Sequence, residues 1–434
     1  MRRLALGFLF LVACGGKTDL DGDAGPADAA APDAVVIKMD ASVVDAPYQP
    51  IGTKCDPPDG AAPLPWAPDD GGAALRPPIM QSSGGPVLTN PVFVTMTFAG
   101  DELADQLSDF VSSVGCTSYW KTAVSDYGVN TAYQGATVQL TDKPPTTIDD
   151  GQIAVFLRQH ILNKQIPDAV QGQTLYVIYY PDSTDITLQG SHSCQSFEGY
   201  HNEVSLSDGR TVPYAVLPRC NLGGLGLLDE LTSFTSHELV EAVTDPFPET
   251  KPAYQLPEPN GVAWALSGGG EVGDLCEAND DAFYMPTDYP FTVQRIWTSH
   301  AAFLAHDPCQ PSDTTYVAAA PLLSDTVSYD IGFGTQQTQG VKLALNDTTH
   351  ISLKIIADGT AAMTTVSVHD ASHQFGGSTA LTFNLSPQQG LPGDTLDLTI
   401  NRVGTTPQIG VEPFVIRATS GQTQRSWWAV VGDP

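Results

Sequence analysis

The stretch from Ser236 to Pro246, with the sequence SHELVEAVTDP, constrains the fold of this chain more than any other. Proline cannot continue a helix, so we predict a helix that ends at Pro246. At about 100° per residue, the apolar residues Leu239, Val240, Ala242 and Val243 fall on one half of this helix. The other half holds His237, Glu238, Glu241, Thr244 and Asp245. We expect the apolar half to pack inward.

The polar half of this helix is unfavourable unless a cation binds to it. Like charges one turn apart repel by about 0.2–0.5 kcal/mol per pair. A carboxylate in the last turn also opposes the helix dipole, at a cost of about 0.3–1 kcal/mol. The run from His237 to Glu241 matches the zinc-protease pattern His-Glu-x-x-His, except that Glu241 stands in place of the second histidine. The helix is therefore a candidate metal site.

A hydrolytic zinc site needs three protein ligands and an open position for water. His237 and Glu241 have the i,i+4 spacing that lets two side chains of one helix face one metal, and Glu238 is expected to take the proton from water. The acidic segment Gly270–Glu277 supplies the third ligand, with Asp274 as first choice and Glu271 and Glu277 next.

The identity and the activity of the metal depend on the chemistry of these ligands. One histidine with carboxylates is a harder set than that of most zinc peptidases, so zinc is expected and manganese or calcium also suits it. Because anionic ligands leave bound water less acidic, a bound metal is a firmer expectation than protease activity. The chain has neither a Gly-x-Ser-x-Gly elbow nor a phosphate-binding loop.

A structural alternative stays open at this stage. His237 and Glu241 would also suit a solvated pair on the surface of an amphipathic helix, with Glu277 in solvent. Asp245 is expected to brace the exit of the helix rather than to bind metal. His192 and His201 flank Cys194 and belong either to a cleft or, by preference, to a loop.

The first residues indicate export. Arg2 and Arg3 precede an apolar run that stops at Cys14 and is too short to span a bilayer, which is typical of a signal peptide. Leu11-Val-Ala-Cys14 resembles a bacterial lipobox, which implies cleavage before Cys14, lipidation of Cys14 and a lipid as the membrane anchor. The alternative is an ordinary signal peptide. Gly15 is not an acidic retention residue, so we expect the outer membrane or the cell surface.

Composition predicts the regions that follow. Residues 15–86 are rich in Asp, Ala, Gly and Pro, and we predict a disordered acidic tether. The formal charge of −30, from 49 acidic and 19 basic residues, argues against nucleic acid or an anionic membrane surface as partner.

Cysteine usage supports an oxidising compartment. Besides Cys14, the chain has Cys55, Cys116, Cys194, Cys220, Cys276 and Cys309. An even number in an exported chain predicts three disulfides. Sequence leaves fifteen pairings open, of which proximity favours Cys194 with Cys220 and Cys276 with Cys309.

Two folded regions follow the tether. Residues 87–310 contain the expected strands 91–98, 174–180 and 212–217, with helices over 101–113, 117–127 and 153–163, which predicts an α+β or α/β region. Residues 314–434 show short alternating apolar runs separated by turn residues. This pattern is typical of an all-β sandwich, which we expect to be immunoglobulin-like.

A resemblance to a known family rests on the acidic segments. The run His237-Glu-Leu-x-Glu-x-x-Thr-Asp-Pro246, followed by Glu271-Val-Gly-Asp-Leu-Cys-Glu277, resembles the Exordium family of phosphate-induced proteins. Val293-Gln-Arg-Ile-Trp297 before Cys309, and Tyr200-His201 after Cys194, also match its pattern. The family's second cysteine pair is not reproduced around Cys220. The resemblance covers about 87–310 and implies a zincin-like domain.

Two functions are therefore expected. The first is a cell-surface lipoprotein with a metal-dependent hydrolase site, a zinc peptidase acting on extracellular protein or peptide. The second is a non-catalytic surface or adhesion protein in which the same metal site is structural or degenerate.

Overall fold

The computed structural model describes residues 52–169, 172–266, 269–330, 334–375, 378–406 and 408–434. The predicted signal segment 1–14, the predicted lipidation residue Cys14 and the predicted tether up to residue 51 lie outside the described residues. Within the described ranges, no helix has both the length and the apolar character needed to cross a membrane.

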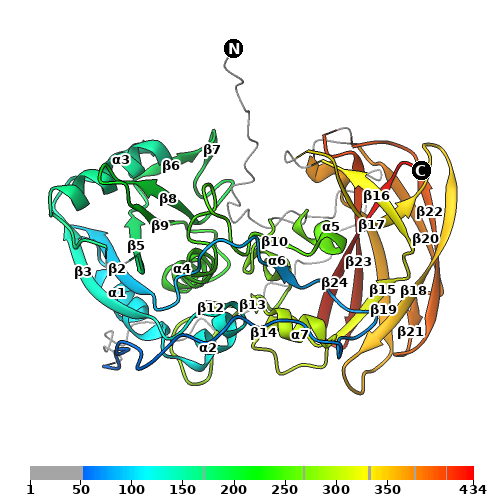
Figure 1. Ribbon diagram of the computed structural model, residues 1–434. Helices are drawn as coiled ribbons and strands as arrows, with labels where there is room; N and C mark the ends of the chain where they lie inside the picture. The colour runs from blue at the N-terminus through cyan, green and yellow to red at the C-terminus, as the bar shows by residue number, and fades with distance from the viewer. Residues whose placement is uncertain (1–51, 170–171, 267–268, 331–333, 376–377, 407) are drawn as a thin grey trace, which may run out of the picture.

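A mixed five-stranded sheet organises the first region (Figure 1). Its strand order is β3-β2-β5-β9-β8, and the strands are β3 (Tyr133–Leu140), β2 (Val92–Phe98), β5 (Thr174–Tyr180), β9 (Thr211–Pro218) and β8 (Tyr200–Ser205). The first four strands run parallel, and the edge strand β8 is antiparallel to β9. The expected strands at 91–98, 174–180 and 212–217 are present, whereas β3 and β8 were not expected.

Helices cover both faces of this sheet. Strand residues alternate between the faces, so Val177 and Tyr179 of β5 join one cluster of buried side chains and Tyr176 and Ile178 join the other. The first cluster packs against α1 (Ala104–Val114), α2 (Ser118–Val124) and α4 (Leu227–Thr244). The second packs against α3 (Asp150–Leu162), whose first turn is closed by a capping box between Asp149 and Gln152.

Short elements complete the first region. A small sheet near α3 contains β4 (Thr147–Asp149), β6 (Asp185–Leu188) and β7 (Ser191–His192). Three two-stranded ladders pair β1 (Met80–Gln81) with β10 (Leu256–Pro257), β11 (Phe283–Tyr284) with β12 (Val293–Gln294), and β13 (Ile296–Trp297) with β14 (Cys309–Gln310). The short helices are η1 (Ser125–Tyr127), η2 (Pro259–Gly261), α5 (Val262–Ala265), α6 (Asp274–Glu277) and α7 (Ser299–Phe303).

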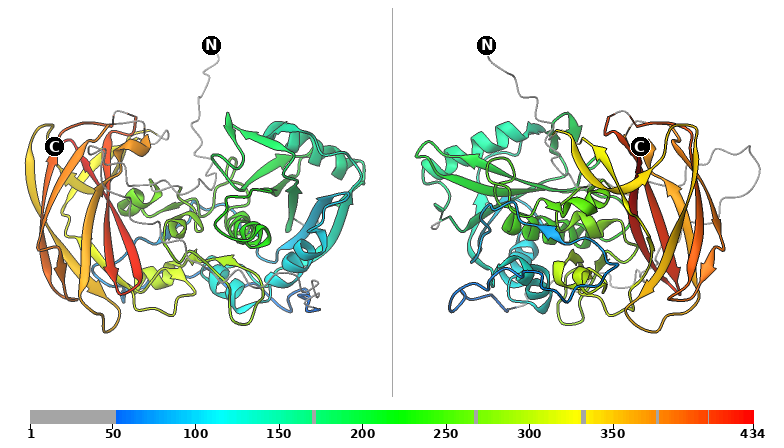
Figure 2. Two further views of the ribbon diagram at one scale, coloured as in Figure 1. Left: turned by 180° about the vertical axis from the view of Figure 1, so that it is seen from behind. Right: turned by 45° about the vertical axis from the view of Figure 1, so that its right-hand side comes forward.

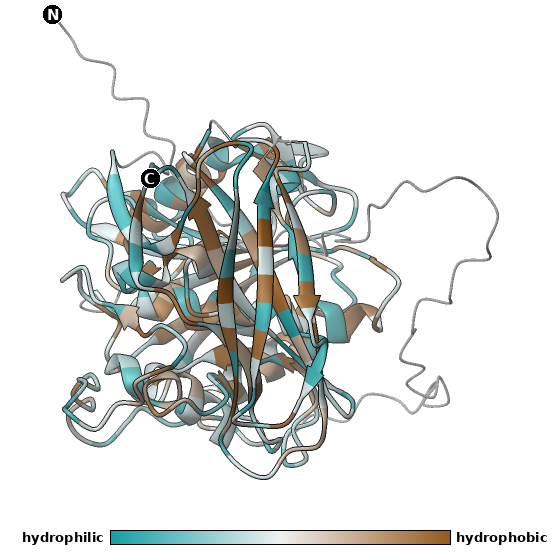
Figure 3. Ribbon diagram, turned by 90° about the vertical axis from the view of Figure 1, so that its right-hand side faces the viewer, coloured by the Kyte–Doolittle hydropathy of each residue, from teal (hydrophilic) through white to brown (hydrophobic). Residues whose placement is uncertain are grey.

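The last region is a β-sandwich, as expected. One sheet has the order β15 (Val317–Pro321), β18 (Thr348–Ala357), β22 (Thr395–Arg402), β20 (Leu381–Ser386). The other has the order β16 (Asp325–Tyr329), β17 (Gln336–Lys342), β24 (Thr423–Gly432), β23 (Val411–Ser420), β19 (Thr364–Asp370), β21 (Gln389–Gly390). The short helix η3 (Ser372–Phe375) follows β19. Figure 3 shows apolar and polar residues alternating along the strands that face the viewer.

The two regions lie side by side (Figures 1 and 2), and buried side chains of both form one core. The cluster of buried side chains on the α4 face of the mixed sheet continues into the sandwich. Trp264 of α5 packs against Trp427 of β24, with their ring centroids 5.6 Å apart. The buried guanidinium of Arg425 pairs with Asp307 at 2.6 Å and with Asp281 at 2.8 Å. Strands β23 and β24 are therefore buried along most of their length.

For residues 52–86, the prediction of a disordered tether is wrong. This segment was expected to be disordered because it is rich in Pro and Gly, but it packs on the first region. Cys55 is joined to Cys116, Met80 is buried in ladder β1–β10, and Arg76 pairs with Glu258 at 2.7 Å. A disulfide and a few anchoring side chains hold this segment, which its composition alone did not indicate.

The six cysteines of the described residues form three disulfides, Cys55–Cys116, Cys194–Cys220 and Cys276–Cys309. The two pairings favoured by proximity are confirmed, and the third joins the remaining cysteines. Three disulfides fit an exported protein, because cytosolic thiols are kept reduced.

Candidate metal centre

Helix α4 is buried on all sides, unlike the amphipathic helix that was expected. It begins at Leu227, well before the predicted start, and every residue from Glu230 to Thr244 is buried. His237 and Glu241 expose only 0 % and 1 % of their surface, so the alternative of a solvated surface pair is wrong. The polar half of α4 faces β8, β12 and the segment around α6, where other polar side chains meet it.

A first group of metal-ligating atoms joins α4 to α6. His237, Glu241 and Asp274 each offer one atom within 4.8 Å of the other two. His237 Nε2 lies 2.9 Å from Glu241 Oε2 and 3.6 Å from Asp274 Oδ1. The longer distance is beyond hydrogen-bonding range, and the buried Asp274 Oδ1 has no hydrogen-bond partner among the described residues. The structure thus brings together the three residues that the sequence analysis ranked first as ligands.

Gln294 of β12 orients the imidazole of His237. The Gln294 side-chain NH₂ donates to the carbonyl oxygen of Gly273 at 2.8 Å, so its Oε1 faces His237 Nδ1, 3.0 Å away, as an acceptor. A neutral His237 would then carry its proton on Nδ1 and offer the lone pair of Nε2 to a metal on the side of Glu241 and Asp274. Sequence reasoning missed this role, although Gln294 belongs to the segment Val293–Trp297 that carries the family resemblance.

The backbone around α6 fixes the two carboxylates. Glu241 Oε1 accepts hydrogen bonds from the backbone N–H groups of Gly273 at 2.9 Å and Asp274 at 3.2 Å. Asp274 Oδ2 accepts one from the N–H of Glu271 at 3.0 Å. Each carboxylate therefore keeps its other oxygen for the site. A β-carbon on Gly273 would lie 2.7 Å from the His237 ring, so glycine is required for this close approach.

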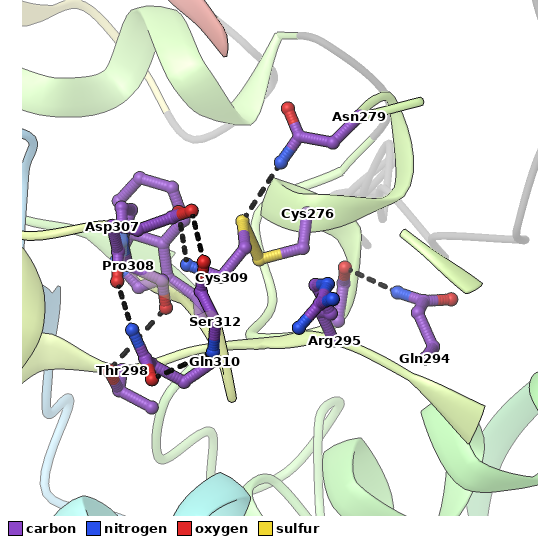
Figure 4. The surroundings of a disulfide bond; sticks show 12 residues. Cys276, Asn279, Gln294, Arg295, Thr298, Asp307, Pro308, Cys309, Gln310 and Ser312 are labelled. Carbon is purple, nitrogen blue, oxygen red and sulfur yellow. Dashed lines mark hydrogen bonds between the residues drawn. A yellow bond between two sulfur atoms is a disulfide. The ribbon is translucent and has the colours of Figure 1, made fainter. Parts of the chain in front are cut away.

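A disulfide bond links α6 to a neighbouring strand (Figure 4). Cys276 of α6 is bonded to Cys309 of β14, and the side-chain amide of Asn279 contacts the Cys309 sulfur at 3.1 Å. Because Asp274 lies two residues before Cys276, this bond limits how far Asp274 can move from α4.

A second group shares Glu241 with the first. His201 of β8, Glu241 and Glu271 also offer atoms within 4.8 Å of one another. His201 Nδ1 lies 3.9 Å from Glu241 Oε2, and His201 Nε2 lies 3.6 Å from Glu271 Oε1. The preference for His201 in a loop is wrong, because β8 carries it into the core with 4 % exposure. The correspondence of Tyr200-His201 with the Exordium pattern was the one available signal.

The remaining predicted residues surround these two groups. Glu238 is buried, and its Oε2 lies 3.4 Å from His201 Nδ1. Gly199 approaches Glu238 so closely that a β-carbon there would lie 2.8 Å from Oε1. Asp245 accepts a hydrogen bond from the N–H of Ala253 at 2.6 Å, as a brace at the helix exit should. Glu277 is half-buried rather than fully solvated.

Burial and mutual repulsion shift the titration of this cluster. Burial lowers the pKa of His237, but the carboxylates of Glu241, Glu238 and Asp274 outweigh it and hold that pKa well above 6.5. Burial and the charge of Glu241 raise the pKa of Asp274 and of Glu271 well above their usual range. Without a cation, His237, Asp274 and Glu271 therefore tend to stay protonated. A bound cation would have to displace these protons.

Two further acids lie near the first group. Burial, together with Glu277 and Glu230, raises the pKa of Glu198 to about 8. Burial, with Glu241 and Glu238 opposed by His237, raises the pKa of Glu277 to about 7. Glu198 was not singled out from the sequence, because it becomes part of the site only when the loop before β8 folds against α4.

Comparison with known proteins leaves the chain without an assigned family. No protein-family model matches it, and no curated protein is similar to it. Among solved structures, "Structure of Titin M4 trigonal form" matches 27% of this chain and 99% of its own, at 12% identity and a TM-score of 0.14. A likeness of this size carries no argument about fold or function.

Proposed function

We propose that this protein is a metal-dependent hydrolase, a zinc peptidase that acts on extracellular protein or peptide. The observation that supports it most is the convergence of His237 Nε2, Glu241 Oε2 and Asp274 Oδ1 in the interior, with an unsatisfied oxygen on Asp274. A buried polar atom without a partner costs about 1–3 kcal/mol, and a cation at this point would remove the cost.

The ligand chemistry fits a divalent cation. One imidazole and two carboxylates, with Gln294 orienting the imidazole, make a ligand set that suits zinc and also manganese or calcium. Bound there, the ion would polarise a carbonyl group and make water a stronger acid.

The residues next to the ligands suggest the other roles. Glu238 follows the ligand His237 directly and is our candidate for the general base, with His201 Nδ1 3.4 Å from its Oε2 as the group that positions it. Strand β8 carries His201 and is the last strand of its sheet. An edge strand can pair with an extended chain, so β8 favours a peptide as substrate.

The family and the location belong to the same proposal. We propose that the first region is a zincin-like domain of the Exordium family and that the sandwich is immunoglobulin-like. We also propose that a lipid on Cys14 holds the protein at the outer membrane or the cell surface. The acidic segments carry the family resemblance, and the three disulfides of the described residues fit an exported protein.

Glu238→Gln tests the catalytic role. The substitution keeps the shape of the side chain and removes its basicity, so we expect full metal content and at least a hundredfold lower turnover of unstructured peptides. Glu102→Gln is the matched control, because the Glu102 side chain is 77% exposed. Metal-loaded wild type without turnover on varied peptides would refute the hydrolase.

One observation favours a second function. The groups that would bind metal are 4 % exposed or less, whereas a hydrolytic ion must be reached by substrate. A non-catalytic surface or adhesion protein with a structural ion would show this burial. For that protein, metal removal lowers the unfolding temperature, and Glu238→Gln changes no activity because there is none.

A further inference from the structure

We infer that the centre holds two divalent cations, the second bound by His201, Glu241 and Glu271, with Glu241 as the ligand shared between them. This inference rests on the proposed function, which needs only the first cation. It assigns a ligand role to His201 and makes Glu241 the bridge between α6 and β8.

The second group has its own unsatisfied atoms. His201 Nε2 and Glu271 Oε1 are buried, find no hydrogen-bond partner in the part of the chain that the structure describes, and lie 3.6 Å apart. This is too long for a hydrogen bond. It is close to the separation of neighbouring ligands around one ion, about 3–3.6 Å for metal–ligand bonds of about 2.0–2.2 Å. The pair His237 Nε2 and Asp274 Oδ1 in the first group shows the same 3.6 Å spacing.

Glu241 belongs to both groups of ligating atoms. Its Oε1 is held by the backbone N–H groups of Gly273 and Asp274. Its Oε2 lies 2.9 Å from His237 Nε2 and 3.9 Å from His201 Nδ1, on the same ring whose Nε2 faces Glu271. Glu241 is therefore placed where two neighbouring cations could share it.

Buried carboxyl groups crowd the second group as well as the first. The two imidazoles are surrounded by carboxyl groups of 4 % exposure or less, among them Glu238, Glu241, Asp245, Glu271 and Asp274. Buried charges without compensation are strongly unfavourable. A cation bound by His237, Glu241 and Asp274 has no bond to Glu271, and a second cation would compensate that carboxylate.

The test counts ions in the full-length protein. The protein is stripped with a chelator, saturated with Mn²⁺ or Zn²⁺, freed of excess metal and analysed by elemental mass spectrometry. We expect two ions per wild-type chain and one in His201→Ala and in Glu271→Gln. His350→Ala, at an exposed position on the sandwich, is the matched control and keeps two.

Each outcome decides the inference. Two ions in the wild type and one in both variants support it. A wild type that saturates at one ion overturns the second site and leaves the proposed function standing. No ion in the wild type overturns both. If His201→Ala does not fold, the wild-type count and the isosteric Glu271→Gln still decide.

Discussion

Adding one methyl group at Gly273 tests whether the metal centre is as tightly built as the structure indicates. A β-carbon at this position would lie 2.7 Å from His237 Cε1 and Nδ1 and 2.8 Å from Glu241 Oε1. Gly273 has φ −80°, so alanine is compatible with its backbone and only the contacts change. Gly273→Ala therefore pushes directly on the two ligands that α4 supplies.

The expected magnitude follows from these contacts. Ordinary contacts of a β-carbon begin near 3.4 Å, so the ligands must move by roughly 0.7 Å. Overpacking of this kind costs about 1–3 kcal/mol. The metal-free site can relax, but coordination fixes the ligand atoms, so most of the cost falls on the bound form. Since about 1.4 kcal/mol is a factor of ten in affinity, Gly273→Ala should weaken metal binding by about tenfold to a hundredfold.

Competition with a fluorescent chelator measures this difference. Gly224→Ala is the matched control, because a β-carbon at Gly224 would have no atom of the described residues within 4 Å and the backbone there suits alanine. We expect wild type and Gly224→Ala to share one Kd. A Kd for Gly273→Ala within twofold of the control would show that Gly273 does not crowd the ligands, and the reasoning would fail.

Two other predictions concern neighbours of the ligands. Gln294→Leu removes the acceptor of the His237 Nδ1 proton. We expect metal affinity to fall by about tenfold to a hundredfold in the same competition assay. An unchanged Kd would mean that Gln294 does not orient the imidazole. The pKa of Glu198 is raised to about 8 in the folded protein, from 4.5, mainly by burial. Between these pH values the folded state keeps the Glu198 proton that the unfolded state releases. Glu198 therefore lowers the free energy of unfolding as pH rises from about 4.5 to about 8. At about 1.4 kcal/mol per pKa unit, Glu198→Gln should stabilise the metal-free protein by up to about 5 kcal/mol above pH 8, with no such pH-dependent gain at pH 4. Urea unfolding at both pH values in chelator measures this, and a gain independent of pH would contradict it.

The sequence predicted the parts of the site that local spacing controls. The i,i+4 relation of His237 and Glu241 places both on one side of any helix, and the apolar runs of β2, β5 and β9 leave few choices other than buried strands. Proximity along the chain also favoured two of the three disulfides. These features depend on neighbours in sequence, so one sequence suffices to find them.

Long-range contacts decided the rest, and they have no signature in local sequence. His201 joins the cluster because β8 adds antiparallel to β9 at the edge of the sheet, which brings its side chain against α4. Gln294 reaches His237 across 57 positions, and Cys55 holds segment 52–86 to Cys116. Pairing of distant segments is set by the whole core, not by the residues that flank them.

The sequence by itself determined that this chain carries a helix with one imidazole and several carboxylates, a mixed region before a β-sandwich, and cysteines for three disulfides. Only the tertiary structure decided that the polar half of α4 is buried, that Glu241 faces two histidines, and that the sandwich shares a core with the first region. The physical reason is that periodicity fixes which residues share a face. What covers that face depends on segments that meet only when the chain is folded.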